Sequence, residues 1–72
     1  MRSTNERVPL LVAVEGVADM LGVSERTVRR LDASGKMPRP LRVGGSVRWR
    51  ADEVSHWVAA GYPSRSIWEG QR

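Results

Sequence analysis

The 72-residue chain contains no cysteine and no phenylalanine, and only one histidine and one lysine. Without cysteine it forms neither disulfides nor thiolate metal sites, which fits a reducing cytoplasm. A single histidine, His56, cannot make a metal site or a catalytic triad alone. The sequence also shows no carboxylate pair, no nucleophile with its base and no phosphate-binding loop. We therefore expect no enzyme activity, no metal, no cofactor and no small-molecule substrate.

Long apolar runs are missing as well. No segment approaches the ~20 apolar residues that a membrane span requires. The run "VPLLVAV" resembles the apolar part of a secretory signal peptide. However, Glu6 interrupts the basic stretch that precedes this run, and Glu15 ends the run after seven residues. We expect no signal peptide and no membrane partner, and we place the protein in the cytoplasm of a bacterial cell.

What the sequence does contain is positive charge, carried almost entirely by arginine. Twelve Lys and Arg residues face eight Asp and Glu residues, for a formal net charge of +4, and eleven of the twelve cations are arginine. The planar guanidinium group suits phosphates and guanine edges. A GC-rich genome would give the same bias, so the positions of the arginines must distinguish the two explanations.

Apolar spacing predicts two helices joined by a tight turn. The first helix follows from apolar residues at the helical period, namely Val14, Val17, Ala18 and Leu21. Gly22 is expected to end it in the left-handed conformation. Ser24 is expected to cap a second helix that reaches about Ala33. Three apolar residues of the turn and second helix are expected to face the core, namely Val23, Val28 and Leu31.

The segment "LRVGGSVRW" predicts a β-hairpin, because apolar and basic residues alternate around Gly44-Gly45-Ser46. A three-residue loop would pair Leu41 with Trp49, Arg42 with Arg48 and Val43 with Val47. The four apolar residues would then share one face. The two arginines would lie directly opposite each other on the other face, where like charges are destabilising unless an anion binds.

A third helix is predicted over about residues 51–60, with an apolar stripe of Val54, Trp57 and Val58. Trp68 in the C-terminal segment either folds back on the core or anchors a partner, and we favour folding back. The expected fold is a small α+β winged helix-turn-helix of order α-α-β-β-α. It would comprise a flexible arm (1–9), the DNA-binding domain (10–61) and a short tail (62–72).

Four residues stand at the relative places of a helix-turn-helix signature, namely Ala18, Gly22, Val28 and Leu31. Together with "SGKMP" and "VRWRADEV", they make residues 10–58 resemble phage excisionases and the related AlpA-type regulators of the MerR-like winged-helix superfamily. The resemblance covers about two-thirds of the chain.

The resemblance implies that the second helix enters the major groove of double-stranded DNA. The residues expected to meet the groove are Ser24, Glu25, Arg26, Thr27, Arg29 and Arg30. Arg26 and Arg30, four positions apart, are expected to lie on one face of the helix and are the best candidates for base or phosphate contacts. The wing would follow phosphates or the adjacent minor groove through Arg42, Gly44, Gly45, Ser46 and Arg48. Three more cations are expected either to touch the backbone or to stay in solvent, namely Lys36, Arg39 and Arg50.

The resemblance further implies an excisionase that binds cooperatively to repeats, bends attachment-site DNA and assists an integrase. Self-association on DNA and an integrase partner follow from that role. A transcriptional regulator of the AlpA type would use the same DNA-binding surface, and the sequence does not separate the two. A protein-interaction module is a more remote alternative.

Overall fold

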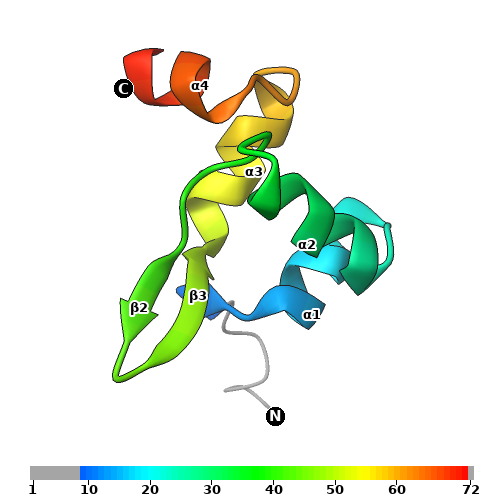
Figure 1. Ribbon diagram of the computed structural model, residues 1–72, viewed down its shortest axis with the longest axis vertical. Helices are drawn as coiled ribbons and strands as arrows, with labels where there is room; N and C mark the ends of the chain where they lie inside the picture. The colour runs from blue at the N-terminus through cyan, green and yellow to red at the C-terminus, as the bar shows by residue number, and fades with distance from the viewer. Residues whose placement is uncertain (1–8, 72) are drawn as a thin grey trace, which may run out of the picture.

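The computed structural model describes residues 9–71, in which helices pack beside a three-stranded antiparallel sheet (Figure 1). The elements in chain order are β1 (Leu11–Val12), α1 (Val14–Leu21), α2 (Glu25–Ala33), β2 (Leu41–Val43), β3 (Ser46–Arg50), α3 (Ala51–Ala59) and α4 (Arg65–Gln71). The predicted α+β winged helix-turn-helix is confirmed, and β1 and α4 are added to the predicted order. Apart from Pro9, the arm expected over residues 1–9 lies outside the described residues.

The turn between α1 and α2 has the predicted left-handed glycine and the predicted serine cap. Gly22 is left-handed, with a φ of 70°, and the Val23 amide donates to the Ala18 carbonyl at 3.0 Å. The Ser24 side chain accepts a hydrogen bond from the Thr27 amide at 3.1 Å, which satisfies an otherwise unpaired donor of the first turn of α2. Two local signals therefore decide where α1 ends and where α2 begins.

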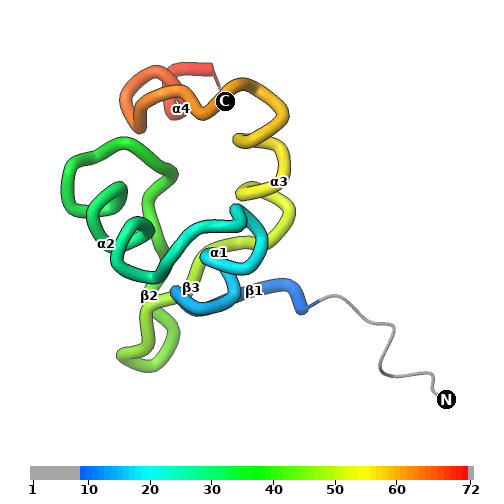
Figure 2. Tube along the Cα trace, turned by 90° about the vertical axis from the view of Figure 1, so that its right-hand side faces the viewer, coloured from blue at the N-terminus to red at the C-terminus, as the bar shows by residue number. Residues whose placement is uncertain are grey.

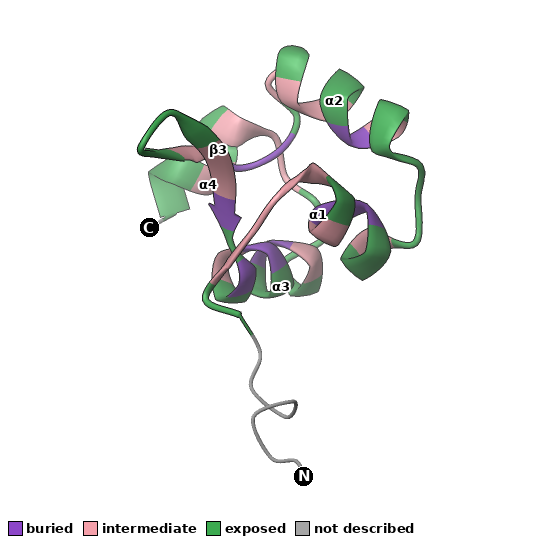
Figure 3. Cartoon of the chain, turned by 90° about the horizontal axis from the view of Figure 1, so that it is seen from below, coloured by how far each residue is buried: buried purple, intermediate pink, exposed green. Residues whose placement is uncertain are grey.

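The core lies between α1, α2, α3 and β3 (Figure 3). Its buried apolar residues are Val17, Ala18, Val28, Met37, Trp49, Val54 and Trp57. Met37 and the neighbouring Pro38 come from the loop between α2 and β2 and were not predicted to be buried. The placement predicted for Val23 is wrong: its side chain is 39% exposed and lies at the rim of the core beside Tyr62.

The wing closes with a two-residue loop, so the predicted three-residue loop is wrong. Gly44 and Gly45 both have positive φ, 58° and 89°, as the tight hairpin turns that match the strand twist require. Ser46 belongs to β3 and pairs with Val43, and the remaining pairs are Leu41 with Arg48 and Arg42 with Val47. A shift of one residue exchanges the faces of a strand. Arg42 and Arg48 are therefore not opposite each other, and the predicted repulsion does not arise.

The predicted apolar face of the hairpin is wrong for the same reason. Trp49 is buried, whereas Val43 is 49% exposed. The centre of the sheet is β3, because β1 pairs with it on the other edge, Leu11 with Arg50 and Val12 with Trp49. A two-residue strand is too short to show a period, so the sequence gives no signal for β1.

The C-terminal segment folds back on the domain, as expected for Trp68. Helix α4 lies at the end of the molecule opposite the wing tip, near the C-terminal end of α3 (Figures 1 and 2). The indole of Trp68 packs against the core cluster, and its Nε1 donates to a carboxylate oxygen of Glu53 at 2.8 Å. Trp57 Nε1 likewise donates to the Pro63 carbonyl at 2.8 Å. Two tryptophan N–H groups thus hold the segment that joins α3 to α4.

Gly16 explains how α1 can lie so close to β1. A Cβ at position 16 would stand 2.8 Å from Cβ of Val12 and 3.2 Å from its Cγ1. Val12 cannot swing away, because Cβ is fixed to a backbone that pairs with β3. The glycine that weakens α1 as a helix is therefore what allows the helix to pack.

We expect Gly16→Ala to destabilise the protein, although alanine is the better helix former by about 1 kcal/mol. Overpacking of this kind costs about 1–3 kcal/mol, so a net loss of roughly 1 kcal/mol should appear in urea denaturation. Gly70→Ala is the matched control, since nothing lies within 4 Å of a Cβ there, and it should leave stability equal or slightly higher. A Gly16→Ala protein more stable than wild type would contradict the packing argument.

Candidate nucleic-acid interface

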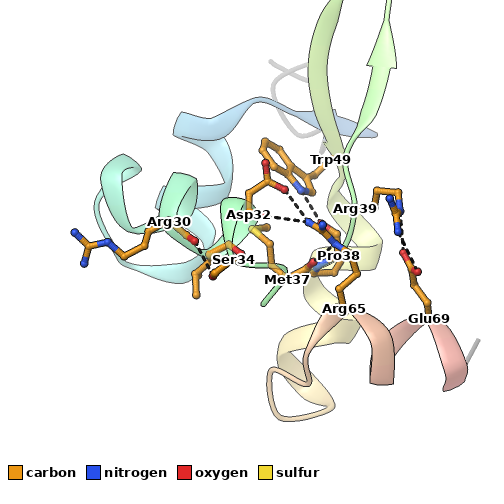
Figure 4. A network of polar contacts seen from close by, with 10 residues as sticks. Arg30, Asp32, Ser34, Met37, Pro38, Arg39, Trp49, Arg65 and Glu69 are labelled. Atoms are coloured by element: carbon orange, nitrogen blue, oxygen red, sulfur yellow. Dashed lines mark hydrogen bonds and ion pairs between the residues drawn. The ribbon is translucent and has the colours of Figure 1, made fainter.

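Two arginines project together from the outward face of α2. Val28 is fully buried, and at 3.6 residues per turn the residues two positions before and after it point away from the core. Those residues are Arg26 and Arg30, both exposed, and their spacing of four makes them neighbours on the helix surface. Figure 4 shows Arg30 extending away from the domain. Their predicted placement on one exposed face is confirmed.

The first turn of α2 is organised by its own side chains. The Ser24 and Thr27 hydroxyl oxygens lie 3.0 Å apart, and Thr27 is only half-exposed. Glu25 and Arg29 form an ion pair at 3.6 Å in which the arginine side chain remains 66% exposed. Exposed pairs of this spacing contribute less than about 1 kcal/mol. Arg29 can therefore leave the Glu25 carboxylate and bind a phosphate at little cost in free energy.

The wing offers cations on both of its faces. By register, Arg42 shares a face with Val47, while Arg48 shares the other face with Leu41. Arg42 is exposed. Arg48 is half-buried, and one of its terminal nitrogens donates to the Val47 carbonyl at 2.8 Å. Gly44 and Gly45 form an exposed tip between them, so the tip itself carries no charge.

A cleft of about 490 Å³ lies between α2 and the wing. Its lining residues are Ala13, Val14, Glu15, Arg29, Asp32, Val47, Arg48 and Trp49. Glu15 and Asp32 bring negative charge into the cleft, which disfavours a phosphate inside it. The cations that an anionic polymer would meet therefore stand on the cleft's rims and on the outward face of α2.

The three other candidate cations differ in their surroundings. Lys36 and Arg50 are exposed. Arg39 reaches across to α4, where its Nε lies 3.1 Å from a carboxylate oxygen of Glu69. The hydrogen bond to Glu69, and then the negative charge of that carboxylate, raise the pKa of Arg39. The positive charge of Arg39 is thus already paired with the Glu69 carboxylate.

Sequence reasoning missed one arginine that the structure places beside α2. Arg65, at the start of α4, binds the last turn of α2 and the loop after it (Figure 4). Its partner Asp32 lies 33 positions earlier in the chain. No local pattern signals a pair so distant, although both residues are charged and only partly exposed.

Across residues 9–71 no three potential metal-ligating side chains come together. In the same span, none of the helices combines the length and apolar character needed to cross a membrane. Within that described part of the chain, the exposed cations of α2 and of the wing strands that form no ion pair are Arg26, Arg30, Arg42 and Arg50, and the half-buried Arg48 forms none either. The unpaired positive charge of the interface is therefore concentrated on these two elements.

No curated protein matches the sequence. Residues 13–62 match a family described as a helix-turn-helix domain, which is typical of excisionase-like DNA-binding proteins and generally non-enzymatic. The matched range contains α1, α2, the wing and α3, and it stops before Arg65 and α4. The match covers more than half of the chain, so the protein belongs to this helix-turn-helix family of DNA-binding domains.

Proposed function

We propose that the protein is an excisionase, a recombination directionality factor that binds double-stranded DNA sequence-specifically and assists an integrase in the cytoplasm. The observation that carries the DNA-binding part is the pair Arg26 and Arg30 on the outward face of a capped helix, beside an arginine-bearing wing. These features provide one helix for a groove and one hairpin for the adjoining backbone.

The dimensions of α2 suit the major groove. An α-helix with its side chains is about 10–12 Å across, so α2, with nine residues, fits the major groove, which is about 12 Å wide. With Val28 buried against the core, Arg26 and Arg30 would face the base edges. Arginine reads guanine by a bidentate pair to O6 and N7. We assign base readout to these two residues, and positioning at the groove edge to Ser24, Glu25, Thr27 and Arg29.

The wing would lie on the phosphate backbone. Arg42 and Arg48 occupy opposite faces of the hairpin, so they can bracket a strand of phosphates instead of both entering one groove. Gly44, Gly45 and the exposed Ser46 let the backbone of the tip approach closely. Lys36, Arg39 and Arg50 would add longer-range attraction.

Bending and assembly follow from the small size of one copy. Bending a 20–30 bp site costs on the order of 1–6 kcal/mol, and we expect a single copy, with one nine-residue helix and a short wing, to supply too little binding free energy for this alone. Several copies side by side on repeats would share that cost through contacts with one another. This arrangement would give an integrase a bent attachment site, and it is the feature that separates an excisionase from a promoter regulator of the AlpA type.

A selection experiment tests the proposal. The full chain is titrated against a pool of random duplexes, and the selected duplexes are run in gel-shift assays at two salt concentrations. A ladder of shifted bands on selected repeats is expected. The logarithm of the binding constant should fall with the logarithm of the salt concentration with a slope of about −4 to −5, because roughly five phosphates are contacted. A single band would favour the promoter regulator, and an absence of selection at both concentrations would overturn DNA recognition in favour of a protein partner.

Individual arginines should separate readout from positioning. Arg26→Ala or Arg30→Ala should relax the base preference at one position of the selected site, at a cost of about 1–3 kcal/mol. Arg42→Ala or Arg48→Ala should weaken binding to every sequence alike and flatten the salt slope by about 1. Competition assays with single-base variants of the site measure both effects. Small and uniform losses at positions 26 and 30 would contradict their assignment to base readout.

A further inference from the structure

The end of α2 is held by a single side chain from α4. The guanidinium of Arg65 donates through Nε to the Met37 carbonyl at 3.0 Å. One of its terminal nitrogens donates to the Asp32 carboxylate at 2.8 Å and to the Asp32 carbonyl at 3.3 Å. The Arg65 amide also donates to the Gly35 carbonyl at 3.0 Å. Figure 4 shows the Arg65 side chain reaching Asp32 of α2 and Met37 of the loop that follows it.

These bonds suit the last turn of a helix. The last carbonyls of an α-helix lack partners within it, and a cation placed there complements the helix dipole. The pair is also partly shielded, since the Arg65 side chain is 20% exposed and that of Asp32 is 33% exposed. A charge-assisted hydrogen bond of this length in such surroundings is stronger than the exposed pairs elsewhere on the surface.

The same loop is tied to the wing. Pro38, next to Met37, accepts a hydrogen bond from Trp49 Nε1 of β3 at 3.0 Å. The loop therefore connects α2, α4 and wing strand β3, which is the central strand of the sheet. Asp32 stands two positions after Arg30, so any rotation of α2 about its axis that releases Asp32 also turns the outward arginine face.

We infer that Arg65 is a positioning residue for DNA recognition: through Asp32 it sets the orientation of α2 relative to the wing. This inference rests on the proposed function. It gives Arg65, which lies beyond the matched range 13–62, a part in the recognition of DNA sequence. Arg65 acts through the protein and touches no DNA. Its loss therefore affects the discrimination between duplexes more than the general attraction to DNA.

Asp32→Ala tests the positioning role, because this role predicts a loss of DNA discrimination whereas the other effects of the substitution favour tighter DNA binding. The substitution removes a carboxylate from the cleft beside the interface and raises the formal net charge of +4 by one. It also replaces aspartate by the best helix former. Electrostatics and helix propensity alone would both favour tighter binding. The positioning role instead predicts that the ratio of affinities for the selected duplex and a scrambled duplex falls by roughly three- to tenfold.

Glu15→Ala is the matched control. Glu15 lines the same cleft from α1, and its removal makes the same change in net charge. This variant should keep the wild-type affinity ratio. A protein that is merely less folded binds both duplexes less well by the same factor, so the ratio separates positioning from general instability.

Arg65→Lys supplies the second variant, because it keeps the charge but not the planar set of donors. It should also lower the affinity ratio, and the Arg65→Lys/Asp32→Ala double variant should be no worse than the poorer single variant. If Asp32→Ala and Arg65→Lys both keep the wild-type ratio, the positioning role is overturned while the proposed function stands. If wild type itself fails to discriminate between the duplexes, the proposed function fails first.

Discussion

The burial of Val28 decides what this protein can present to DNA. Val28 is fully buried against the core formed with α1 and α3. Because α2 is a regular helix, fixing one residue inward fixes the direction of every other residue on it. Arg26 and Arg30 must then point outward. Neighbouring residues make the burial of Val28 possible. Ala18 allows α1 to approach α2 closely, Gly22 forms the turn between the two helices, and Ser24 caps the start of α2.

The loop between α2 and β2 is the second element on which the arrangement depends. In a chain of 72 residues the core is small, and this loop supplies two of its fully buried residues, Met37 and Pro38. Buried loop backbone needs hydrogen-bond partners. The Pro38 carbonyl finds one in Trp49 of the wing and the Met37 carbonyl finds one in Arg65 of α4. The loop thus joins α2, the wing and the C-terminal helix α4.

Signals carried by neighbouring residues allowed much of this to be predicted from the sequence. The period of α2 predicted that Arg26 and Arg30 share a face, and Gly22 and Ser24 marked the helix ends. The hairpin register was not fixed in this way, because Gly44-Gly45-Ser46 fits both a two-residue and a three-residue loop. The pairing between Asp32 and Arg65, 33 positions apart, and the two-residue strand β1 depend on tertiary packing alone. The half of the site that lies on one helix was therefore predictable, and the contacts that orient that helix were not.

We propose that α2 and the wing meet the same DNA duplex and that α3 stays outside this contact. The most direct test is to titrate isotopically labelled full-length protein with a selected duplex and to follow the backbone amide resonances. We expect the large shifts to fall on residues 24–30 and on Gly44 and Gly45, and the resonances of Asp52 and His56, two exposed residues of α3, to change little. Shifts concentrated on α3 and α4, with the arginine face of α2 unaffected, would contradict this proposal.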